Sequence, residues 1–352
     1  MSREIWLVSE HGRTGVSPSA AERRALRDDG LQVAVYYVGP GEAIVVSRRR
    51  EAVLIDGGSN SHLPKNDALG RKLANRMKAD GLRLRAIIAS HPHQDHTNFY
   101  HELVTEHQEL FAPDAQYFDN GTVPATNQWN RLKDWRSDLP FERRTVADDP
   151  SKDGRDRIPG FAADADAHLL RGTKGKPAPD SEAVKYWSIF LFLRFRKAWL
   201  LFTGDAYMDY EEMLLDRLKG LSRRAHLLKV THHGSSGGTS PSLVANLRPA
   251  VAVASTDSDP GHRLEADVRD RLSVSAVYTT YEGAGPGRDI FVRTDGQVRP
   301  GREAGGLCLK WRHDGRQSVA EQGMCGRSED QLIPGAREGR RGRRDGGHVV
   351  GP

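Results

Sequence analysis

Residues 90–96 read SHPHQDH, and this stretch decides the fold. It directly follows the apolar run RLRAIIA, which is typical of a buried strand. In extended backbone the side chains at positions i and i+2 share a face, so His91 and His93 can bind one metal ion. Asp95 and His96 lie where the chain turns toward a helix, and they can reach a second ion. Imidazoles and a carboxylate at this spacing suit a divalent ion such as Zn²⁺ or Mn²⁺.

Three further clusters of polar residues follow apolar runs later in the chain. FTGD places Asp205 after a strand, where a carboxylate can bridge two ions, although TGD alone is typical of a turn that caps a helix. KVTHHGS supplies His232 and His233, and DPGH supplies His262. Adjacent histidines on extended chain point to opposite faces, so we expect one of His232 and His233 to be a ligand. Strand ends are the usual location of sites in layered α/β folds.

The surrounding sequence predicts such a layered α/β protein. Residues 31–56 contain three β-branched runs separated by GPG and a basic turn, which indicates sequential antiparallel strands. Fourfold spacing of apolar residues predicts a helix over 67–80, and strands then alternate with helices from 186 to 280. The predicted organisation is an N-terminal extension (1–30), a main domain (31–300) with an irregular insertion or lid (112–185), a C-terminal strand and loop (301–333), and a disordered tail rich in Arg and Gly (334–352).

The order of these motifs resembles the metallo-β-lactamase fold. The motifs are VGPGEA (38–43), LIDGG (54–58), SHPHQDH (90–96), LLFTGD (200–205), LLKVTHHGS (227–235) and PGH (260–262). More narrowly, VGPGEA and KVTHHGS resemble the hydrolase domain of the ComEC-type DNA-uptake proteins. The resemblance covers about residues 31–300. It implies a four-layer αββα sandwich with a two-metal hydrolytic site between its sheets.

The resemblance also implies roles for individual residues. In this reading Asp205 bridges the two ions. Two-metal chemistry further assigns proton transfer to Asp95 or a neighbouring histidine. Lys229 faces the phosphate or its leaving oxygen at the mouth of the cleft, the alternative being a strand-end lysine paired with a carboxylate. The remaining implied roles are His91 and His93 as ligands of the first ion, Asp95 and His96 as ligands of the second, His232 and His262 as completing ligands, and Asp56 and His233 as supporting or alternative ligands.

The sequence departs from the family pattern in one informative way. Many members carry a ligand histidine shortly before the FTGD strand, but here the nearest histidine is His168. The ComEC-like branch also lacks this histidine, so the gap supports the narrower resemblance and argues against antibiotic hydrolysis. The DNA-uptake proteins have a multi-helix channel, which this sequence does not contain. We therefore do not expect it to transport DNA by itself.

Composition excludes several other classes of protein. The 352 residues are 37% hydrophobic and 28% charged, which fits neither a disordered chain nor a membrane bundle. The longest apolar run, Trp187–Leu193, is far below the roughly 20 residues of a spanning helix. The run Ile5–Val8 is too short for a secretory signal, and Cys308 and Cys325 form no CxxC pair. We expect a cytoplasmic protein with no membrane contact.

The net charge of +5 says little about partners, because five arginines of the tail 334–352 supply much of it. This tail is typical of a solvated end, with electrostatic contact to nucleic acid as the other reading. Three functions stay open: a two-metal phosphodiesterase or nuclease using Zn²⁺ or Mn²⁺, a two-metal hydrolase of a small ester, lactone or thioester, and a non-catalytic binding or regulatory protein. The first predicts nucleic acid or another phosphodiester as the substrate. Protein partners in a multigene bacterial system are also expected.

Overall fold

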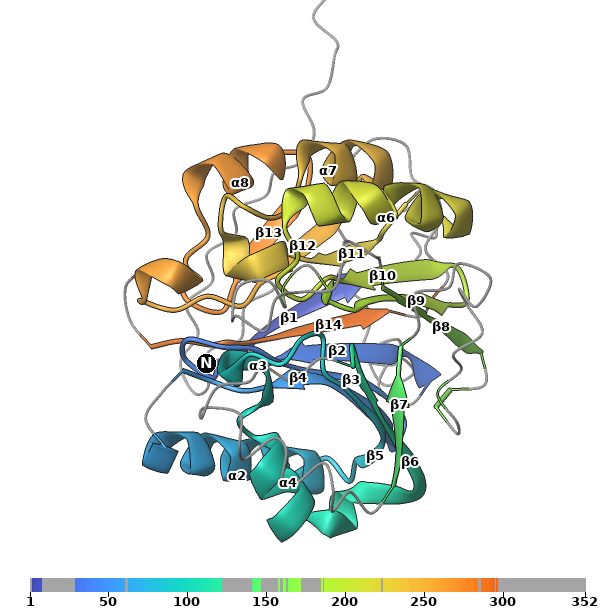
Figure 1. Cartoon of the computed structure of the whole chain (residues 1–352), viewed down its shortest axis with the longest axis vertical. Coiled ribbons are helices and arrows are strands. Elements are labelled where there is room, and N and C mark those ends of the chain that lie inside the picture. The colour runs from blue at the N-terminus through green and yellow to red at the C-terminus, as the bar shows by residue number, and fades with distance from the viewer. Residues whose placement is uncertain are drawn as a thin grey trace, which may run out of the picture.

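The structure is a computed structural model, which describes most of the chain up to residue 296. The described residues are 2–7, 29–60, 63–121, 141–146, 158, 161–162, 164–171, 185, 187–222, 224–283, 286–294 and 296. The predicted C-terminal strand and loop (301–333) and the tail (334–352) lie outside the described residues. Two β-sheets pack face to face between two layers of helices (Figure 1). The predicted four-layer αββα sandwich is therefore confirmed.

The first sheet has eight described strands and carries the SHPHQDH motif. Its middle strands alternate in direction up to β4, and β4 to β7 then run parallel. In spatial order the strands are β1 (Ser2–Leu7), β14 (Asp289–Thr294), β2 (Leu31–Val35), β3 (Ala43–Arg48), β4 (Glu51–Gly57), β5 (Arg83–Ile88), β6 (Phe111–Asp119) and β7 (Glu142–Thr145).

The second sheet has six described strands and carries the other three clusters of polar residues. Four of its strands are parallel, and two antiparallel strands complete one edge. In spatial order they are β13 (Ala276–Thr279), β12 (Val251–Ala254), β11 (Leu227–Lys229), β10 (Ala198–Phe202), β9 (Phe190–Phe195) and β8 (Ala165–Leu170).

Helices cover the outer face of each sheet (Figure 1). On the first sheet these are α2 (Leu63–Ala79) and α4 (Tyr100–Glu106). The short α3 (Gln94–Thr97) lies between them in the sequence, directly before α4. On the second sheet they are α6 (Met208–Leu221), α7 (Pro241–Leu247) and α8 (Ala266–Arg271). The helix predicted over 67–80 is α2, and it ends two residues before Gly81, whose positive φ of 62° suits a residue without a side chain.

Alternation along the strands explains why both sheet faces are buried. In β2 and β3, Val33 and Val46 face the core between the sheets, whereas Ala34 and Val45 pack under the helices. A third apolar cluster lies between the second sheet and its own helices. Strands buried on both faces need continuous β-branched and apolar runs, and the sequence has them.

Two segments differ from the predicted organisation. The segment 112–185 is more regular than predicted, because it contains most of β6 together with β7 and β8, which extend one sheet each. Its remaining residues lie largely outside the described part. The N-terminal extension contributes β1, which pairs in parallel with β14 and forms the edge of the first sheet.

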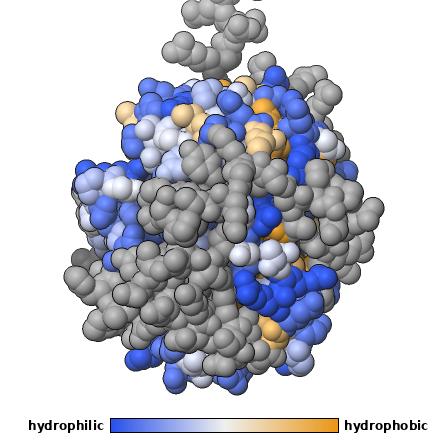
Figure 2. Space-filling model, in the orientation of Figure 1, coloured by the Kyte–Doolittle hydropathy of each residue, from blue (hydrophilic) through white to orange (hydrophobic). Residues whose placement is uncertain are grey.

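The described surface is mainly polar. Only Met213 and Val274 are exposed large hydrophobic side chains among the described residues. Hydrophilic residues cover most of the coloured surface in Figure 2, with small apolar patches between them. No described helix combines the length and the apolar character that crossing a membrane requires.

Candidate metal centre

The predicted site residues meet at one edge of the sandwich, where β4, β5, β10, β11 and β12 end. Asp56 closes β4, and the SHPHQDH loop follows β5. Asp205 follows β10, and His233 follows β11. Because β4 and β5 are parallel, as are β10, β11 and β12, their carboxyl ends lie together. The two sheets thus bring separate stretches of sequence onto one buried cluster.

Close packing of backbone fixes the two loops that carry the ligand candidates. A Cβ atom at Gly58 would collide with the carbonyl oxygen of Gln94, inside the SHPHQDH loop. A Cβ atom at Gly204 would lie 2.6 Å from Ser90 Oγ, and Gly204 also has a positive φ of 57°. Glycine is therefore required where LIDGG and FTGD touch the loop.

Asp56 orients the histidines of the loop. Its carboxylate accepts hydrogen bonds from Ser90 N at 2.8 Å and from Ser90 Oγ at 2.8 Å. His96 Nδ1 lies 2.8 Å from Asp56 Oδ2, so this nitrogen donates to the carboxylate and Nε2 faces the other donors. A carboxylate behind a ligating histidine fixes its tautomer and its ring orientation. The structure places Asp56 in the supporting position that the family resemblance implies.

Four buried donors form the centre of the site: Asp95, His96, Asp205 and His233. One ligand atom from each lies within 4.8 Å of the others. His96 Nε2 is 3.3 Å from Asp205 Oδ2, and His233 Nε2 is 3.5 Å from both Asp95 Oδ2 and Asp205 Oδ2. Two carboxylates and two imidazoles facing one point are the donors of a divalent metal site.

Unpartnered polar atoms point to the same place. His96 Nε2, His233 Nε2 and Asp205 Oδ1 are buried and make no hydrogen bond. A buried polar atom without a partner costs about 1–3 kcal/mol, and a bound cation would remove that cost for three atoms at once. The residues present therefore fit a divalent metal ion.

Electrostatics favours the ionised form of the two carboxylates. Burial opposes ionisation of Asp95 and Asp205, but His96 and the other nearby histidines together outweigh it and hold the pKa of both carboxyls well below the usual range. Burial, together with His96 and His93, lowers the pKa of His91 well below its ordinary value, so His91 is neutral. Burial also acts to lower the pKa of His96 and His233, but the nearby carboxylates together outweigh it and raise both, that of His233 to about 9. Metal ligands must be carboxylates and neutral imidazoles, so binding of a metal ion would release protons from His96 and His233.

His91 and His93 form a second group of donors beside this cluster. His91 Nε2 lies 2.9 Å from His93 Nδ1 and 3.9 Å from Asp205 Oδ2. His91 Nδ1 contacts Ser90 Oγ at 3.0 Å, so Nε2 is the atom that faces the site. Asp205 Oδ2 thus lies 3.9 Å from His91 Nε2 and 3.3 Å from His96 Nε2, and its bridging role stays a prediction.

The HHGS segment does not have the extended backbone that the sequence suggests. His232 and His233 both adopt left-handed backbone, with φ of 52° and 56°, so they do not point to opposite faces of a strand. His233 is fully buried and faces Asp95 and Asp205, whereas His232 Nε2 lies 3.8 Å from Asp205 Oδ2 and contacts Lys185. The four-donor cluster contains His233, the alternative ligand, in place of His232.

His262 contacts the cluster from the PGH loop. Its Nε2 lies 3.1 Å from Asp95 Oδ2, and its ring packs against His233 with centroids 4.3 Å apart. It is not one of the four donors that meet within 4.8 Å. In this arrangement His262 holds the Asp95 carboxylate in place.

Lys229 does not face the mouth of the cleft, so that prediction is wrong. Its side chain is 1% exposed and forms an ion pair with Glu42, which is equally buried. Burial acts to lower the pKa of Lys229, but Glu42 together with Asp205 and Asp56 outweighs burial and raises it. Glu42 directly precedes β3 of the first sheet and Lys229 ends β11 of the second, so the pair links the two sheets. Nothing in the sequence distinguished this pairing from a lysine that faces substrate.

Glu42 and Asp56 also approach His96 as a further group of acidic and imidazole donors. Glu42 is already paired with Lys229, and Asp56 with Ser90 and His96. These contacts use the carboxylates, so we assign no metal ion to this group.

Sequence reasoning missed two residues near the site, Glu211 and Lys185. Glu211 of α6 is buried and accepts hydrogen bonds from Thr231 Oγ1, Thr239 N and Ser240 N, which holds the HHGS turn. A signal for Glu211 existed, because it shares a helix face with Leu214, Leu215 and Leu218. No motif pointed to Lys185.

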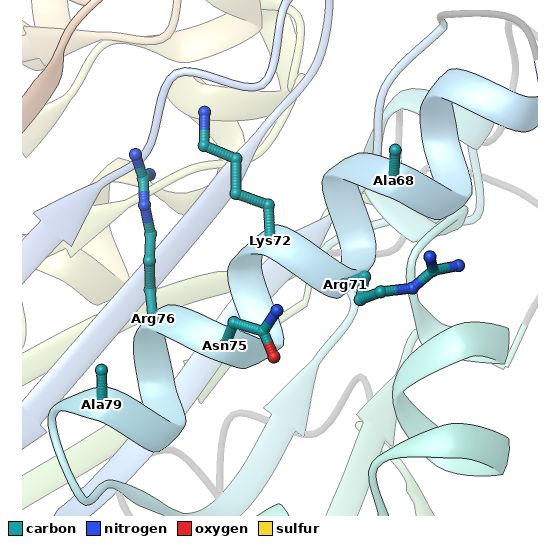
Figure 3. A pocket seen from close by; sticks show the side chains of 6 residues that line it. All are labelled: Ala68, Arg71, Lys72, Asn75, Arg76 and Ala79. Carbon is teal, nitrogen blue, oxygen red and sulfur yellow. The ribbon is translucent and has the colours of Figure 1, made fainter.

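A separate hollow lies on the outside of the molecule. It has a volume of about 410 Å³ and runs along the exposed face of α2 (Figure 3). Arg71 and Arg76, which line it, are paired with Glu102 and Asp289. It contains none of the predicted site residues, so the candidate site is the buried cluster and not this hollow.

Known proteins are similar to this chain in sequence and in fold. The family model described as "Metallo-beta-lactamase superfamily" matches residues 36–179, a span that includes the SHPHQDH loop. Over this span the chain is similar to the metallo-beta-lactamase superfamily. A curated relative, ComE operon protein 3 of Bacillus subtilis (strain 168), is 27% identical over 271 residues, which is 72% of this chain. The matched region spans only 32% of that relative.

Three solved structures are similar to this chain at low sequence identity. YhfI from Bacillus subtilis has a TM-score of 0.45 and 14% identity, with 74% of this chain and 99% of YhfI covered. The short form of human tRNase Z has a TM-score of 0.38 and 11% identity, with 70% and 93% covered. Zn²⁺-bound PqqB from Methylobacterium extorquens has a TM-score of 0.41 and 12% identity, with 71% and 87% covered.

Proposed function

We propose that this chain is a metal-dependent phosphodiesterase, and more narrowly a nuclease, with two divalent ions in its site. The observation that carries the proposal is the buried convergence of Asp95, His96, Asp205 and His233, with His91 and His93 beside them. Such a donor set is typical of metal-dependent hydrolases. Similarity to ComE operon protein 3, together with the VGPGEA and KVTHHGS motifs, favours a phosphodiester over a small ester.

When bound, divalent ions supply an activated water and stabilise charge on the attacking and leaving oxygens of a phosphodiester. The residues of this chain would hold and orient that centre. Asp205 would bridge the two histidine groups, and Asp56 would fix the tautomer of His96. His262 would hold Asp95 through the contact between Nε2 and Oδ2. The role of Asp95 in proton transfer stays a prediction.

Incubation of the purified protein with nucleic acids and model esters tests this function. The substrates are single- and double-stranded DNA and RNA, bis(p-nitrophenyl) phosphate and a lactone, each with Mn²⁺, Zn²⁺ or a chelator. We expect metal-dependent cleavage of phosphodiesters, lowered at least about a hundredfold by Asp205→Ala, which removes the bridging carboxylate. Lactone hydrolysis without cleavage of any phosphodiester would replace the proposal with the small-ester function.

A folded protein that binds metal and turns over none of these substrates would favour the third reading, a binding or regulatory protein. Metal content measured by mass spectrometry on the same samples separates this outcome from failure to load the site.

A further inference from the structure

The loop of residues 36–42 joins β2 to β3 beside the candidate metal centre. It contains most of the VGPGEA motif, yet it supplies none of the four central donors. Glu42 N donates to the carbonyl oxygen of Asp95 at 2.9 Å, and a Cβ atom at Gly41 would lie 2.8 Å from the same oxygen. One end of the loop therefore packs directly against the backbone of a donor.

The other end of this loop reaches the second sheet through Tyr37. The Tyr37 hydroxyl donates to Asp257 Oδ2 at 2.5 Å, and Asp257 lies in the segment that follows β12. Because β2 and β12 belong to the two facing sheets, this hydrogen bond crosses between them (Figure 1). Tyr37 N donates to Asp289 Oδ1 at 3.0 Å, and the Tyr37 ring stacks on that of Tyr281 with centroids 6.4 Å apart. The backbone and the ring thus hold the hydroxyl toward Asp257.

Asp257 in turn fixes the loop that carries His262. Asp257 N donates to the carbonyl oxygen of His262 at 2.7 Å, and His262 N donates to the carbonyl oxygen of Asp259 at 2.9 Å. The second carboxylate oxygen, Asp257 Oδ1, accepts from Ser258 Oγ at 3.0 Å and from Asp259 N at 3.2 Å. From this loop His262 Nε2 meets Asp95 Oδ2 at 3.1 Å. A continuous set of contacts therefore leads from Tyr37 to a central donor.

The direction of the Asp95 carboxylate needs such a support. The last torsion of an Asp side chain is broad, so the backbone alone does not fix where its oxygens lie. Asp95 Oδ2 faces His233 Nε2 at 3.5 Å and His262 Nε2 at 3.1 Å. A contact behind a metal donor orients that donor, and it does so only if the contacting residue is itself held in place. Tyr37 and Asp257 hold His262 in this way.

We propose that Tyr37 and Asp257 are positioning residues of the metal centre, and that they act on Asp95 through His262. The loop 36–42 then holds Asp95 twice, at its backbone through Glu42 and at its carboxylate through Tyr37. The proposal deepens the proposed function and rests on it only for the presence of a divalent ion. It gives the VGPGEA loop a role in metal binding, although no residue of that loop is one of the central donors.

A double-mutant cycle tests this route. Tyr37→Phe removes the hydroxyl and keeps the ring, and His262→Ala removes the contact with Asp95. Competition with a chelating dye measures the Co²⁺ affinity of the wild type, both single variants and the double variant. The absorption spectrum of each Co²⁺-loaded protein reports the geometry around the ion, and urea unfolding without metal reports stability.

Two variants serve as controls. Tyr281→Phe removes the hydroxyl of the stacked ring, and that hydroxyl makes no hydrogen bond to the described residues. Lys72→Met lies on the exposed face of α2. Both variants should match wild type in Co²⁺ affinity and in spectrum.

We expect Tyr37→Phe to lower Co²⁺ affinity by about 3–10-fold and to change the Co²⁺ spectrum, and His262→Ala to lower affinity by about 10–100-fold. The double variant should bind no more weakly than His262→Ala, because Tyr37 has no route to Asp95 once the imidazole is gone. If Tyr37→Phe does not fold, Asp257→Asn takes its place in the cycle.

Three results would overturn the inference. Tyr37→Phe could leave the Co²⁺ affinity unchanged, or it could lower the affinity by the same factor with and without His262, as a purely structural role predicts. Complete loss of metal in His262→Ala would make this histidine a ligand and not a support.

Failure of this inference differs from failure of the proposed function. Additive effects in a protein that still cleaves phosphodiesters would remove the inference and leave the function standing. The expected cycle in a protein that binds metal but cleaves no phosphodiester would keep the inference and remove the function. A wild-type protein that binds no divalent ion would contradict both.

Discussion

At the scale of single residues, Asp56 shows how one buried carboxylate organises a metal loop. It adopts left-handed backbone, with φ of 55°, which is costly for a residue that has a side chain. That conformation places both carboxylate oxygens against Ser90 and His96. The backbone cost is offset by three hydrogen bonds, which hold Ser90 and His96 in fixed orientations.

Asp56→Asn tests this supporting role. An amide can still fill the space, but its NH₂ group opposes one of the three donors, so the tautomer of His96 is no longer fixed. We expect metal affinity to fall by about 10–100-fold while the fold persists. Competition with a chelating dye measures the affinity, and circular dichroism checks the fold. Equal affinity in wild type and variant would show that His96 is oriented by other contacts.

The pair of Lys229 and Glu42 leads to a stability prediction rather than a catalytic one. Lys229→Met leaves the carboxylate of Glu42 buried without its partner, and breaking a buried pair costs about 3–5 kcal/mol. We expect a loss of that size in urea unfolding. The double variant Glu42→Gln with Lys229→Met should recover most of it, since no uncompensated charge remains. A single variant as stable as wild type would mean that water replaces the lysine.

Residue types could be predicted from the sequence far better than their orientations. SHPHQDH and FTGD named His91, Asp95, His96 and Asp205, because a strand end places consecutive polar residues at one point. The choice between His232 and His233 could not be made, since it depends on a left-handed turn that extended-chain reasoning does not foresee. The direction of Lys229 was equally undetermined, because its partner is 187 positions away in the sequence.

At the scale of elements, helix α6 supports the turn that carries His233. Three consecutive residues of this turn, His232, His233 and Gly234, have positive φ. Glu211 accepts from Thr231 Oγ1 at 2.6 Å, Thr239 N at 2.8 Å and Ser240 N at 2.6 Å. Burial raises the pKa of Glu211, but these donors act in the opposite direction. A costly turn is thus held by a carboxylate from the neighbouring helix.

Glu211→Ala should therefore lower the metal affinity, although Glu211 is not a ligand candidate, because it holds the turn that carries His233. The variant leaves buried N–H groups of Thr239 and Ser240 without acceptors, at about 1–3 kcal/mol each. We expect unfolding free energy to fall by about 2–4 kcal/mol and metal affinity to fall with it. Glu212→Ala, on the exposed side of the same helix, is the control. If only stability changed and metal affinity did not, the turn would hold its shape without Glu211.

The elements themselves were predictable where the pattern was strong. The runs of β2, β3 and β4 and the helix α2 follow from apolar spacing, because each buries at least one full face. By contrast, β7 reads ERRT and is exposed, so it has no apolar pattern to find. It forms because β6 offers an edge with free backbone groups, which is a tertiary cause and not a local one.

At the scale of the whole molecule, the site depends on both sheets at once. The first sheet supplies Asp95 and His96, and the second supplies Asp205 and His233. The predicted sandwich made this convergence foreseeable, since parallel strand ends meet at one edge. A bound ion would therefore link the two sheets of the fold. Removal of the metal should then lower the free energy of unfolding of the whole domain.

Chelation is the last prediction. An ion that binds only the folded state adds about 4 kcal/mol at a concentration a thousandfold above its dissociation constant. For a chain of this size that corresponds to a Tm about 5 °C higher than in excess chelator. Differential scanning calorimetry with Zn²⁺, Mn²⁺ or chelator measures the shift. Asp205→Ala lacks the carboxylate shared by both groups of donors and should show little response to chelator, whereas Lys72→Met should respond like wild type. A wild-type Tm that is the same with and without metal, while metal content changes, would mean that the ion does not join the two sheets.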